Sequence, residues 1–422
     1  MNQFAKQKVL FLTEKLAEQD YSCYLCRQNV YRMESLSRLS TFFRRPFFRD
    51  QRTLFALWLL LPIVAAIMKI SKHNNFLIFR GVFWHALQGL PLYGEYPEEY
   101  FDSNYYGPFF SLVIAPFAVM PEWVGLLFWL VALSMFLYVA IRKLPVRDGF
   151  QIAVLWFCAH ELLTALFMSQ YNVAIAAGIL LTFICLEREH DFWGAFFIML
   201  GTFVKLYGIV GLAFFFFSRH KRRFVLSLLF WAAVMFAAPM LLSGPEYIVG
   251  QYADWLTNLT SKNDANQFSG GQNISLLGMV RKLSGCATYS DLWLIVPGMA
   301  FFALPYLRWQ QFRHLPFRLT VMASVLMFTV LFSTGSESST YIIAFVGVAI
   351  WYWAAPWHRN RWDVALMVLA FVLTSMSPSD LFPAYIRKTW VQPYALKALP
   401  VALIWLKLTF EMCSRNYASN RS

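Results

Sequence analysis

Long apolar runs alternate with short polar stretches along almost the whole chain. Twelve runs approach the roughly 17–25 apolar residues that a helix needs to cross a bilayer, and they cover 53–70, 107–120, 122–141, 150–168, 172–186, 193–217, 224–243, 291–306, 318–334, 341–356, 362–376 and 394–410. Because several runs are short, we expect some neighbouring pairs to be hairpins that do not cross fully. The pattern predicts an all-α polytopic membrane protein, a bundle of about twelve transmembrane helices with both termini on the same side.

The composition supports this class and excludes others. Of the 422 residues, 59% are hydrophobic and only 14% are charged, which is too apolar for a soluble globular protein. A formal net charge of +13 could indicate binding to nucleic acid. However, the basic residues form short clusters between the apolar runs, as the positive-inside rule describes for membrane proteins. We therefore expect membrane lipid, and no nucleic acid, as a partner.

The basic clusters also orient the chain. Counted straight through the twelve runs, four clusters fall on one face, which becomes the cytoplasmic one: 44–52, 219–223, 308–318 and 358–361. Both termini are then cytoplasmic, in a protein of the inner membrane. We expect three parts: a cytoplasmic N-terminal extension (1–52), a transmembrane domain (53–410) and a cytoplasmic tail (411–422). One basic loop, 142–148, falls on the outer face instead. A re-entrant segment near 107–120 or 193–217 would correct this.

The outer face receives the long loops 71–106, 244–290 and 377–393 and the short loop 333–340. Transporters usually keep their loops short and bind substrate near the bilayer midplane, between repeated halves. No such repeat is evident in this sequence, and its outer loops are aromatic and acidic. An active site that faces outward fits this pattern better than a transport path.

The first outer loop contains the most informative pattern. Apolar residues recur in it at helical spacing, namely at Phe76, Phe79, Phe83 and Leu87. This spacing predicts an amphipathic helix over 76–88 that lies in the membrane interface. The helix should stop at Gly89 and Pro91.

Four carboxylates follow this helix before the chain re-enters the membrane at Gly107 and Pro108, and they are Glu95, Glu98, Glu99 and Asp102. Any one of them alone reads most simply as part of a solvated loop. As a group among aromatic residues at the membrane boundary, they favour a catalytic or ligand-binding role. Clustered carboxylates could also hold a divalent metal ion through oxygen ligands, although the sequence identifies no specific cofactor.

Five segments carry a further signal through their order and spacing: "NNFLIFRGVFWHALQGLPLYG" (74–94), "YYGPFFSLVIAPFAVMPEWVGLLFW" (105–129), "SQYNVAIAAGILLTF" (169–183), "WGAFFIMLGTFVKLYGIVGL" (193–212) and "GGQNISLLGMVRKL" (270–283). Together they resemble glycosyltransferase family 87, in the GT-C superfamily. The resemblance extends from about residue 53 to the last helix, which is most of the chain.

The resemblance implies a GT-C-like glycosyltransferase that transfers a sugar, with inversion, from a polyprenyl-phosphate donor on the outer leaflet. Mannose is the sugar that the family favours, and glycolipids or polysaccharides are its usual acceptors. It also implies that a carboxylate in the first outer loop acts as the general base.

Two departures from the family move the expected base. The position that matches the family's acidic residue is Asn75, whose amide cannot accept the proton. The passage that bears a histidine in the family corresponds to 333–345, which contains none. We therefore expect Asp102 to be the base, with Glu98 or Glu99 orienting the sugar or a metal, and we keep Glu95 as a further candidate. Asn75 stays a candidate for donor binding.

Lys205 is the natural candidate for the donor phosphate. It lies at the centre of the apolar run 193–217, where an unpaired ammonium would cost at least ~2.5–3.5 kcal/mol. The phosphate would supply the missing counter-charge. His85 and Arg80 are weaker candidates for the donor site, because basic residues on an interfacial helix often only snorkel to water.

Four other polar residues are candidates for binding the acceptor or the sugar. Gln170 and Asn172 could do so, or could only hydrogen-bond neighbouring helices. Glu337 lies among hydroxyl-bearing residues and reads equally well as a helix cap or as a sugar ligand. Asn273, in the last of the five matching segments, is grouped with them.

The rival interpretation is a transporter or flippase for a polyprenyl-linked saccharide, which would have the same spans, aromatic residues and basic patches. It would be favoured if Lys205, Gln170 and Asn172 lined a polar path through the membrane while the loop carboxylates were peripheral. A third interpretation, a structural subunit of a polysaccharide assembly, is supported only by the missing acidic residue at position 75.

Overall fold

The computed structural model describes residues 45–266, 269, 271–286 and 288–418. The chain divides into two compact units, 1–54 and 55–422, and most of the predicted N-terminal extension at 1–52 lies outside the described residues. In the first unit the structure describes the short helix α2 (Pro46–Arg49) and the beginning of α3 (Gln51–Lys69). The regular structure of the described residues is helical throughout, without strands.

Apolar helices dominate the second unit and confirm a membrane protein. Five helical segments are long and apolar enough to cross a bilayer: α3, α6 (Glu122–Arg142), α7 (Asp148–Leu166), α10 with α11 (Lys221–Ala237 and Met240–Ser243), and α14 with η2 (Leu292–Ala303 and Leu304–Arg313). Shorter apolar helices are α8 (Asn172–Glu187), η1 (Tyr207–Phe217), α15 (Leu315–Leu331) and α16 (Tyr341–Ala354). The expected number of about twelve spans is therefore not confirmed by helix length alone.

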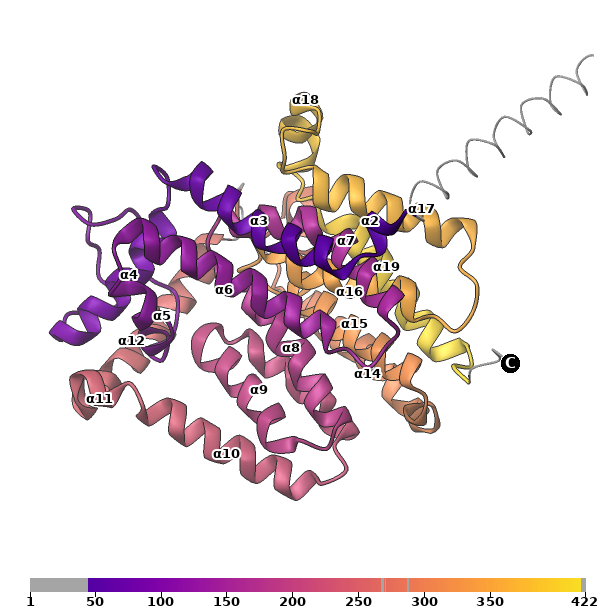
Figure 1. The fold of residues 1–422 in the computed structure, drawn as a ribbon, viewed down its shortest axis with the longest axis horizontal. Coiled ribbons are helices and arrows are strands. Elements are labelled where there is room, and N and C mark those ends of the chain that lie inside the picture. Colours follow the sequence, from indigo (N-terminus) through magenta and orange to yellow (C-terminus); the bar gives the residue numbers. More distant parts are fainter. Residues whose placement is uncertain (1–44, 267–268, 270, 287, 419–422) are drawn as a thin grey trace, which may run out of the picture. The chain divides into compact units, whose positions relative to one another are not determined.

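The core of the second unit forms around α8, α15 and α16, which are buried along almost their whole length. These helices are apolar on every side, so they are stable only where other helices surround them. α8 contacts α6, α9 (Asp191–Lys205) and η1, and α15 packs against α16 and α19 (Ala398–Ser414) (Figure 1). The remaining elements are α4 (Asn74–Gln88), α5 (Phe110–Ala118), α12 (Pro245–Asn266), α13 (Leu276–Ser284), η3 (Ser338–Thr340), α17 (Arg361–Leu369), η4 (Ala370–Met376), α18 (Ala384–Ile386) and η5 (Arg387–Val391).

The run 193–217, which the sequence predicts as one span, is a helical hairpin. α9 ends where Leu206 adopts a left-handed conformation (φ 58°), and η1 then runs back along it. The two arms touch at glycines, because a Cβ on Gly208 would lie only 2.3 Å from the carbonyl oxygen of Ile198. At the open end, the Ser218 hydroxyl donates to Asp191 Oδ1 over 2.7 Å. The prediction of a single span is wrong here, whereas the alternative of a re-entrant segment agrees with the hairpin, whose tip is 205–207.

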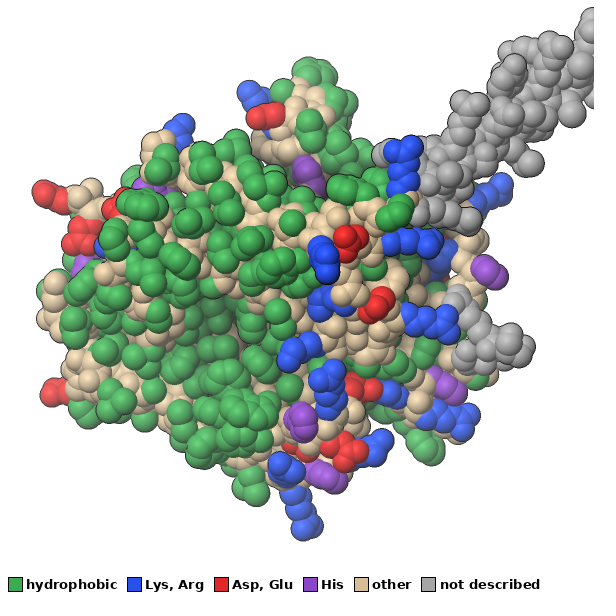
Figure 2. Space-filling model, in the orientation of Figure 1, with side chains coloured by type: hydrophobic (Ala, Val, Ile, Leu, Met, Phe, Trp, Pro, Cys, Tyr) green, Lys and Arg blue, Asp and Glu red, His purple; other side chains and the backbone are tan. Residues whose placement is uncertain are grey.

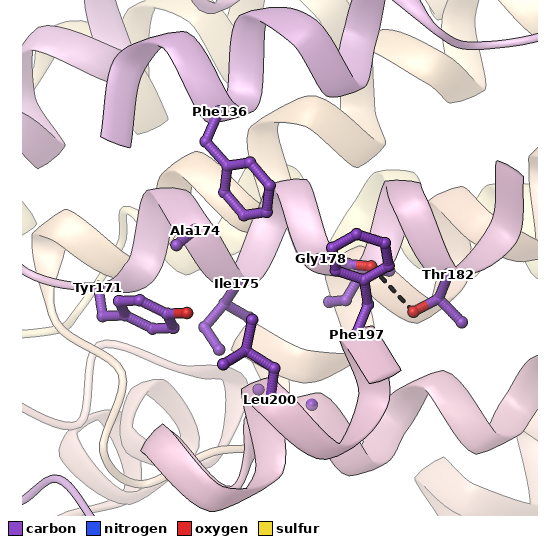
Figure 3. Close-up of a pocket in the computed structure, with 11 residues that line it drawn as sticks. Phe136, Tyr171, Ala174, Ile175, Gly178, Thr182, Phe197 and Leu200 are labelled. Carbon is purple, nitrogen blue, oxygen red and sulfur yellow. Dashed lines mark hydrogen bonds between the residues drawn. The ribbon is translucent and has the colours of Figure 1, made fainter. Parts of the chain in front are cut away.

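Close packing also marks the contact between this hairpin, α6 and α8. Figure 3 shows Phe136, Ile175 and Phe197 around a cavity of only about 10 Å³. The hydroxyl of Thr182 does not point to a partner helix, because it donates to the Gly178 carbonyl of its own helix over 2.9 Å. Around Gly178 and Thr182, dispersion contacts and not polar bonds therefore hold the hairpin against α8.

The run 107–120 contains only the nine-residue helix α5, which is too short to cross a bilayer. Before it, the Gly107 amide donates to the Val204 carbonyl near the hairpin tip, over 3.0 Å. After it, Glu122 contacts His73 at the beginning of α4, over 2.5 Å. The chain thus enters and leaves at the same end of the helices, and the predicted crossing at 107–120 is wrong.

These two changes together place the basic loops on one side. Arg188 donates to the Lys143 carbonyl over 3.3 Å, Arg219 pairs with Glu189 over 2.6 Å, and Arg318 pairs with Glu187 over 2.6 Å. The loop 142–148 therefore lies with 219–223 and 308–318, although the straight count of spans put it on the opposite face. Figure 2 shows basic side chains gathered over this end, beside a largely apolar middle.

The first outer loop begins with α4, whose end agrees with the prediction. Gly89 caps the helix in a left-handed conformation (φ 69°). The apolar stripe of α4 is mostly buried, and the helix packs on α5. Its location in the membrane interface remains a prediction.

Candidate active site

A cavity of about 410 Å³ lies at the hairpin tip, at the end of the bundle opposite the basic loops. It is formed by the beginning of α4, the first outer loop, residues 168–170, the hairpin tip, α12 and residues 333–337. Its polar lining includes Asn75, Asp102, Gln170, Lys205, Lys262, Asn263, Gln272 and Glu337. Of the eleven residues assigned from the sequence, five therefore line one cavity, although they are distant in the chain.

Asp102 is held in a specific orientation at this cavity. Its backbone is in the left-handed region (φ 79°), which costs energy for a residue other than glycine and is common at functional sites. Its Oδ1 accepts hydrogen bonds from the Ser103 amide over 2.8 Å and from the Tyr105 hydroxyl over 3.0 Å. Its Oδ2 lies 3.8 Å from Lys262 Nζ. The side chain is 44% exposed, so a substrate hydroxyl can reach it.

Tyr105 acts on Asp102 as a hydrogen-bond donor. Burial and the adjacent Asp102 carboxylate raise the pKa of the Tyr105 phenol well above its ordinary value. The phenol therefore stays protonated at physiological pH and cannot compete with Asp102 as a base.

Lys205 is the last residue of α9, at the hairpin tip, and not in the middle of a span. Its Nζ donates to Asn172 Oδ1 over 2.6 Å and lies 5.5 Å and 5.3 Å from the ring centres of Tyr106 and Tyr207. A neutral amide oxygen and two aromatic faces hold the ammonium in place, and the Glu337 carboxylate in the same cavity attracts it electrostatically. It can still attract an anion in the cavity.

Gln170, Asn172 and Glu337 form one hydrogen-bond network behind the cavity. Gln170 Nε2 donates to Glu337 Oε2 over 2.7 Å, and Asn172 Nδ2 donates to Gln170 Oε1 over 2.8 Å. The Glu337 amide also donates to Thr340 Oγ1 over 3.1 Å, as part of a capping box. Glu337 is thus a helix cap whose carboxylate also lines the cavity, while Asn172 is buried and connects Lys205 to Gln170.

Asn75 lines the same cavity as Asp102. Its Nδ2 donates to the Met168 carbonyl over 2.8 Å, which joins α4 to the segment before Gln170. The position that the sequence resemblance matches to the family's acidic residue therefore opens into the cavity that holds Asp102. This arrangement is consistent with a base that has moved to another loop position.

Five further candidates and Glu95 lie outside this cavity. His85 pairs with Glu99 over 3.1 Å, and Arg80 contacts Glu122 over 3.4 Å. Glu95 and Glu98 are exposed. Asn273 is fully buried and accepts a hydrogen bond from the Ser275 hydroxyl over 2.8 Å, at the beginning of α13. None of these six residues lines the cavity, although Gln272, the neighbour of Asn273, does.

The main residue that the sequence analysis missed is Lys262. It lies on α12 with Asn263, and both line the cavity. Two hydrogen bonds connect α12 to the first outer loop. Trp255 Nε1 donates to the Tyr105 carbonyl over 3.0 Å, and Asn258 Nδ2 donates to the Asn104 carbonyl over 2.8 Å. The only signal in the sequence was the helical spacing of Trp255, Asn258 and Lys262, which places them on one face of α12.

A second cavity, of about 580 Å³, adjoins the first and shares Leu206, Tyr207, Asn263, Ser333 and Thr334 with it. Its walls come from η1, α13, α14 and α15. One part of the wall is apolar, with Ile209, Val210, Leu292, Ile295, Phe328 and Phe332, and another part is polar and includes Arg281 and Asp291, which pair over 2.7 Å. Ile209 is 45% exposed and Leu292 is 61% exposed, so this cavity reaches the apolar outer surface.

Metal coordination gains no support from the geometry. Among the residues that the structure describes, no three His, Cys, Asp or Glu side chains are grouped so that they could hold a metal ion.

Comparison with known proteins identifies the family. A comparison with curated proteins gives no match. The family model of glycosyltransferase family 87 matches residues 104–334, which is more than half of the 422 residues. The matched stretch contains the hairpin and α12, while Asp102 and Glu337 lie just outside it. The chain therefore belongs to glycosyltransferase family 87, as its sequence resemblance predicted, and is a membrane glycosyltransferase.

Proposed function

We propose that the cavity at the hairpin tip transfers a sugar from a polyprenyl-phosphate donor to a hydroxyl of a glycolipid or polysaccharide acceptor. The observation that carries this proposal is that Asp102 and Lys205 line one cavity. Mannose is the sugar that we propose, on the family resemblance.

Asp102 is the proposed general base. The acceptor hydroxyl gives its proton to Asp102 as its oxygen attacks the anomeric carbon from the side opposite the phosphate, so the configuration inverts. A positioned base contributes roughly 10²–10⁴-fold to the rate. The hydrogen bonds from Ser103 and Tyr105 hold the carboxylate in place, while the exposure of Asp102 leaves room for the acceptor.

Lys205 is the proposed ligand of the donor phosphate. As the bond from the anomeric carbon to the phosphate oxygen breaks, negative charge increases on the phosphate. A cation that is already fixed in place stabilises this charge without reorganisation. Lys205 meets this requirement, because Asn172, Tyr106 and Tyr207 hold its ammonium at the cavity.

The second cavity is the proposed site for the polyprenyl chain. The apolar part of its wall, on η1, α14 and α15, suits isoprene units, and the exposed residues on η1 and α14 would let a lipid enter from the bilayer. The shared boundary at the hairpin tip would place the attached phosphate beside Lys205.

The proposed orientation follows from the loops. If the basic loops are cytoplasmic, the cavity opens on the outer face of the inner membrane, and the C-terminus after α19 is cytoplasmic. The proposed donor and acceptor would then meet outside the cell.

The polar network offers little support for the rival transporter. Behind the cavity, Asn172 Nδ2 also donates to Ser339 Oγ and Thr340 Oγ1, over 3.3 Å and 3.4 Å. The residues that follow Asn172 along α8 are buried and almost entirely apolar. The next cavity along α8, between α6 and the hairpin, has a volume of about 10 Å³. These features favour transfer at the surface of the bundle.

The test is transfer by the purified protein with synthetic polyprenyl-phosphate sugars. Asp102→Asn keeps the size of the side chain and removes the base, so turnover should fall by about 10²–10⁴-fold while donor binding is retained. Glu98→Gln and Glu99→Gln are matched controls and should stay active. Lys205→Met should mainly raise the KM for the donor. If Asp102→Asn turns over like the parent, Asp102 is not the base, and if one glutamate variant fails instead, that glutamate is.

A further inference from the structure

Lys262 is the second cation that lines the active-site cavity, and its ion pair with Asp102 is long. Its Nζ lies 3.8 Å from Asp102 Oδ2 and 4.0 Å from the ring centre of Tyr105. The side chain is 20% exposed. Partly exposed ion pairs at this distance are weak, so the ammonium can leave Asp102 for a stronger partner nearby.

The proposed reaction moves one negative charge across the cavity. Before the reaction, Asp102 is a carboxylate and the donor phosphate, as a diester, carries a single negative charge. Afterwards Asp102 holds the acceptor's proton and is neutral. The electron pair of the broken carbon–oxygen bond stays on the phosphate, which is now a monoester with nearly two negative charges.

We propose that Lys262 follows this charge: it pairs with Asp102 in the free enzyme and with the leaving phosphate as transfer proceeds. This inference rests on the proposed function. Proton transfer to Asp102 removes the attraction that holds Lys262, in the same step that increases the charge on the phosphate. Lys262 is thus a catalytic residue that acts on the leaving group, and the loss of its first partner drives it to the second.

The two lysines then have different tasks. Lys205 has an amide oxygen and two aromatic rings as fixed partners and serves the phosphate of the bound donor. Lys262 has a carboxylate partner whose charge disappears during the reaction. Lys262 should therefore favour the product phosphate over the donor, and Lys205 should serve both.

The test compares the affinities of two lipids for the purified full-length protein. One is polyprenyl phosphate, the product, and the other is the intact polyprenyl-phosphate sugar. At about pH 8 the monoester is almost fully doubly charged. Lys262→Met should weaken binding of polyprenyl phosphate by roughly 10-fold or more and binding of the donor by about 3-fold or less. Lys262→Arg keeps the charge and should restore most of the product affinity.

Two further variants complete the experiment. Lys388→Met removes an exposed cation outside the cavity and should bind both lipids as the parent does. Asp102→Asn releases Lys262 and removes a competing negative charge, so it should bind polyprenyl phosphate more tightly. Equal losses for both lipids in Lys262→Met, or unchanged affinities, would overturn the role of Lys262. A parent protein that binds neither lipid would instead refute the proposed donor.

Discussion

The substitution Lys397→Met should destabilise the protein, because Lys397 and Glu161 form a fully buried ion pair. Their side chains are 4% and 0% exposed, and Lys397 Nζ donates to Glu161 Oε1 over 2.8 Å. The same ammonium donates to the carbonyl and hydroxyl oxygens of Ser338, over 2.9 Å and 3.0 Å. Methionine removes all three bonds and leaves the Glu161 carboxylate buried without its cation.

The expected loss is about 3–5 kcal/mol of unfolding free energy, which is typical when one partner of a buried pair is removed. With roughly 2.1 cal/mol/K of unfolding entropy per residue, a chain of 422 residues should melt about 3–6 °C lower. Transfer activity should also fall, even at temperatures below the melting temperature, since Ser338 is the first residue of η3 and follows Glu337, whose carboxylate lines the cavity.

Thermal unfolding of the detergent-purified variants, at one scan rate, measures this effect. The double variant Lys397→Met with Glu161→Leu removes both charges and should recover most of the lost stability. Lys388→Met, at an exposed position, should melt like the parent. The reasoning is refuted if Lys397→Met melts at the parent's temperature, or if the double variant is no more stable than the single one.

Two further predictions concern the hairpin and the topology. Gly208→Ala would place a methyl group 2.3 Å from the Ile198 carbonyl oxygen and 2.4 Å from the Thr202 amide nitrogen. We expect the unfolding free energy to fall by at least about 1–3 kcal/mol, which should lower the melting temperature. Gly149→Ala is the control, because its methyl group meets no atom within 4 Å, and it should melt like the parent. Equal melting temperatures of the two variants would contradict the hairpin packing. The topology is tested in intact cells with the exposed Cys286 replaced by serine. An impermeant thiol reagent should label cysteines placed at Ser103 and Ser269 but not one placed at Arg147, and protection of either serine position or labelling at 147 would contradict the proposed sidedness.

The sequence by itself determined the class of the protein and much of its chemistry. The apolar runs predicted a helical membrane protein, because burial in lipid demands long apolar helices whatever their arrangement. The order of five local segments was enough to predict the family. Lys205 could be selected from its position inside an apolar run, where an unpaired charge is costly unless something uses it. Asp102 and Glu337 could be selected as carboxylates of predicted outer loops, Gln170 as a polar residue beside an apolar run, and Asn75 through the family resemblance.

The path of the chain through the membrane was decided only by tertiary structure. Hydropathy measures how apolar a segment is but not where it turns, so 193–217 looked like one span. The break at Leu206 is stabilised by the contact of Gly201 with Gly208, which exists only once the two arms lie side by side. The same limit concealed that α5 stays at one end, and counting 107–120 as a crossing put the loop 142–148 on the wrong face.

Tertiary structure also decided which of the candidates meet. Glu98, Glu99 and Asp102 are neighbours in the sequence, yet only Asp102 lines the cavity, because its left-handed backbone and its bonds to Ser103 and Tyr105 set its direction. Lys262 comes from α12, far along the chain, and reaches Asp102 because α12 is bonded to the first outer loop. Local patterns show which residues have unusual chemistry, but the distances between residues that are far apart in the chain arise only from the packing of whole helices.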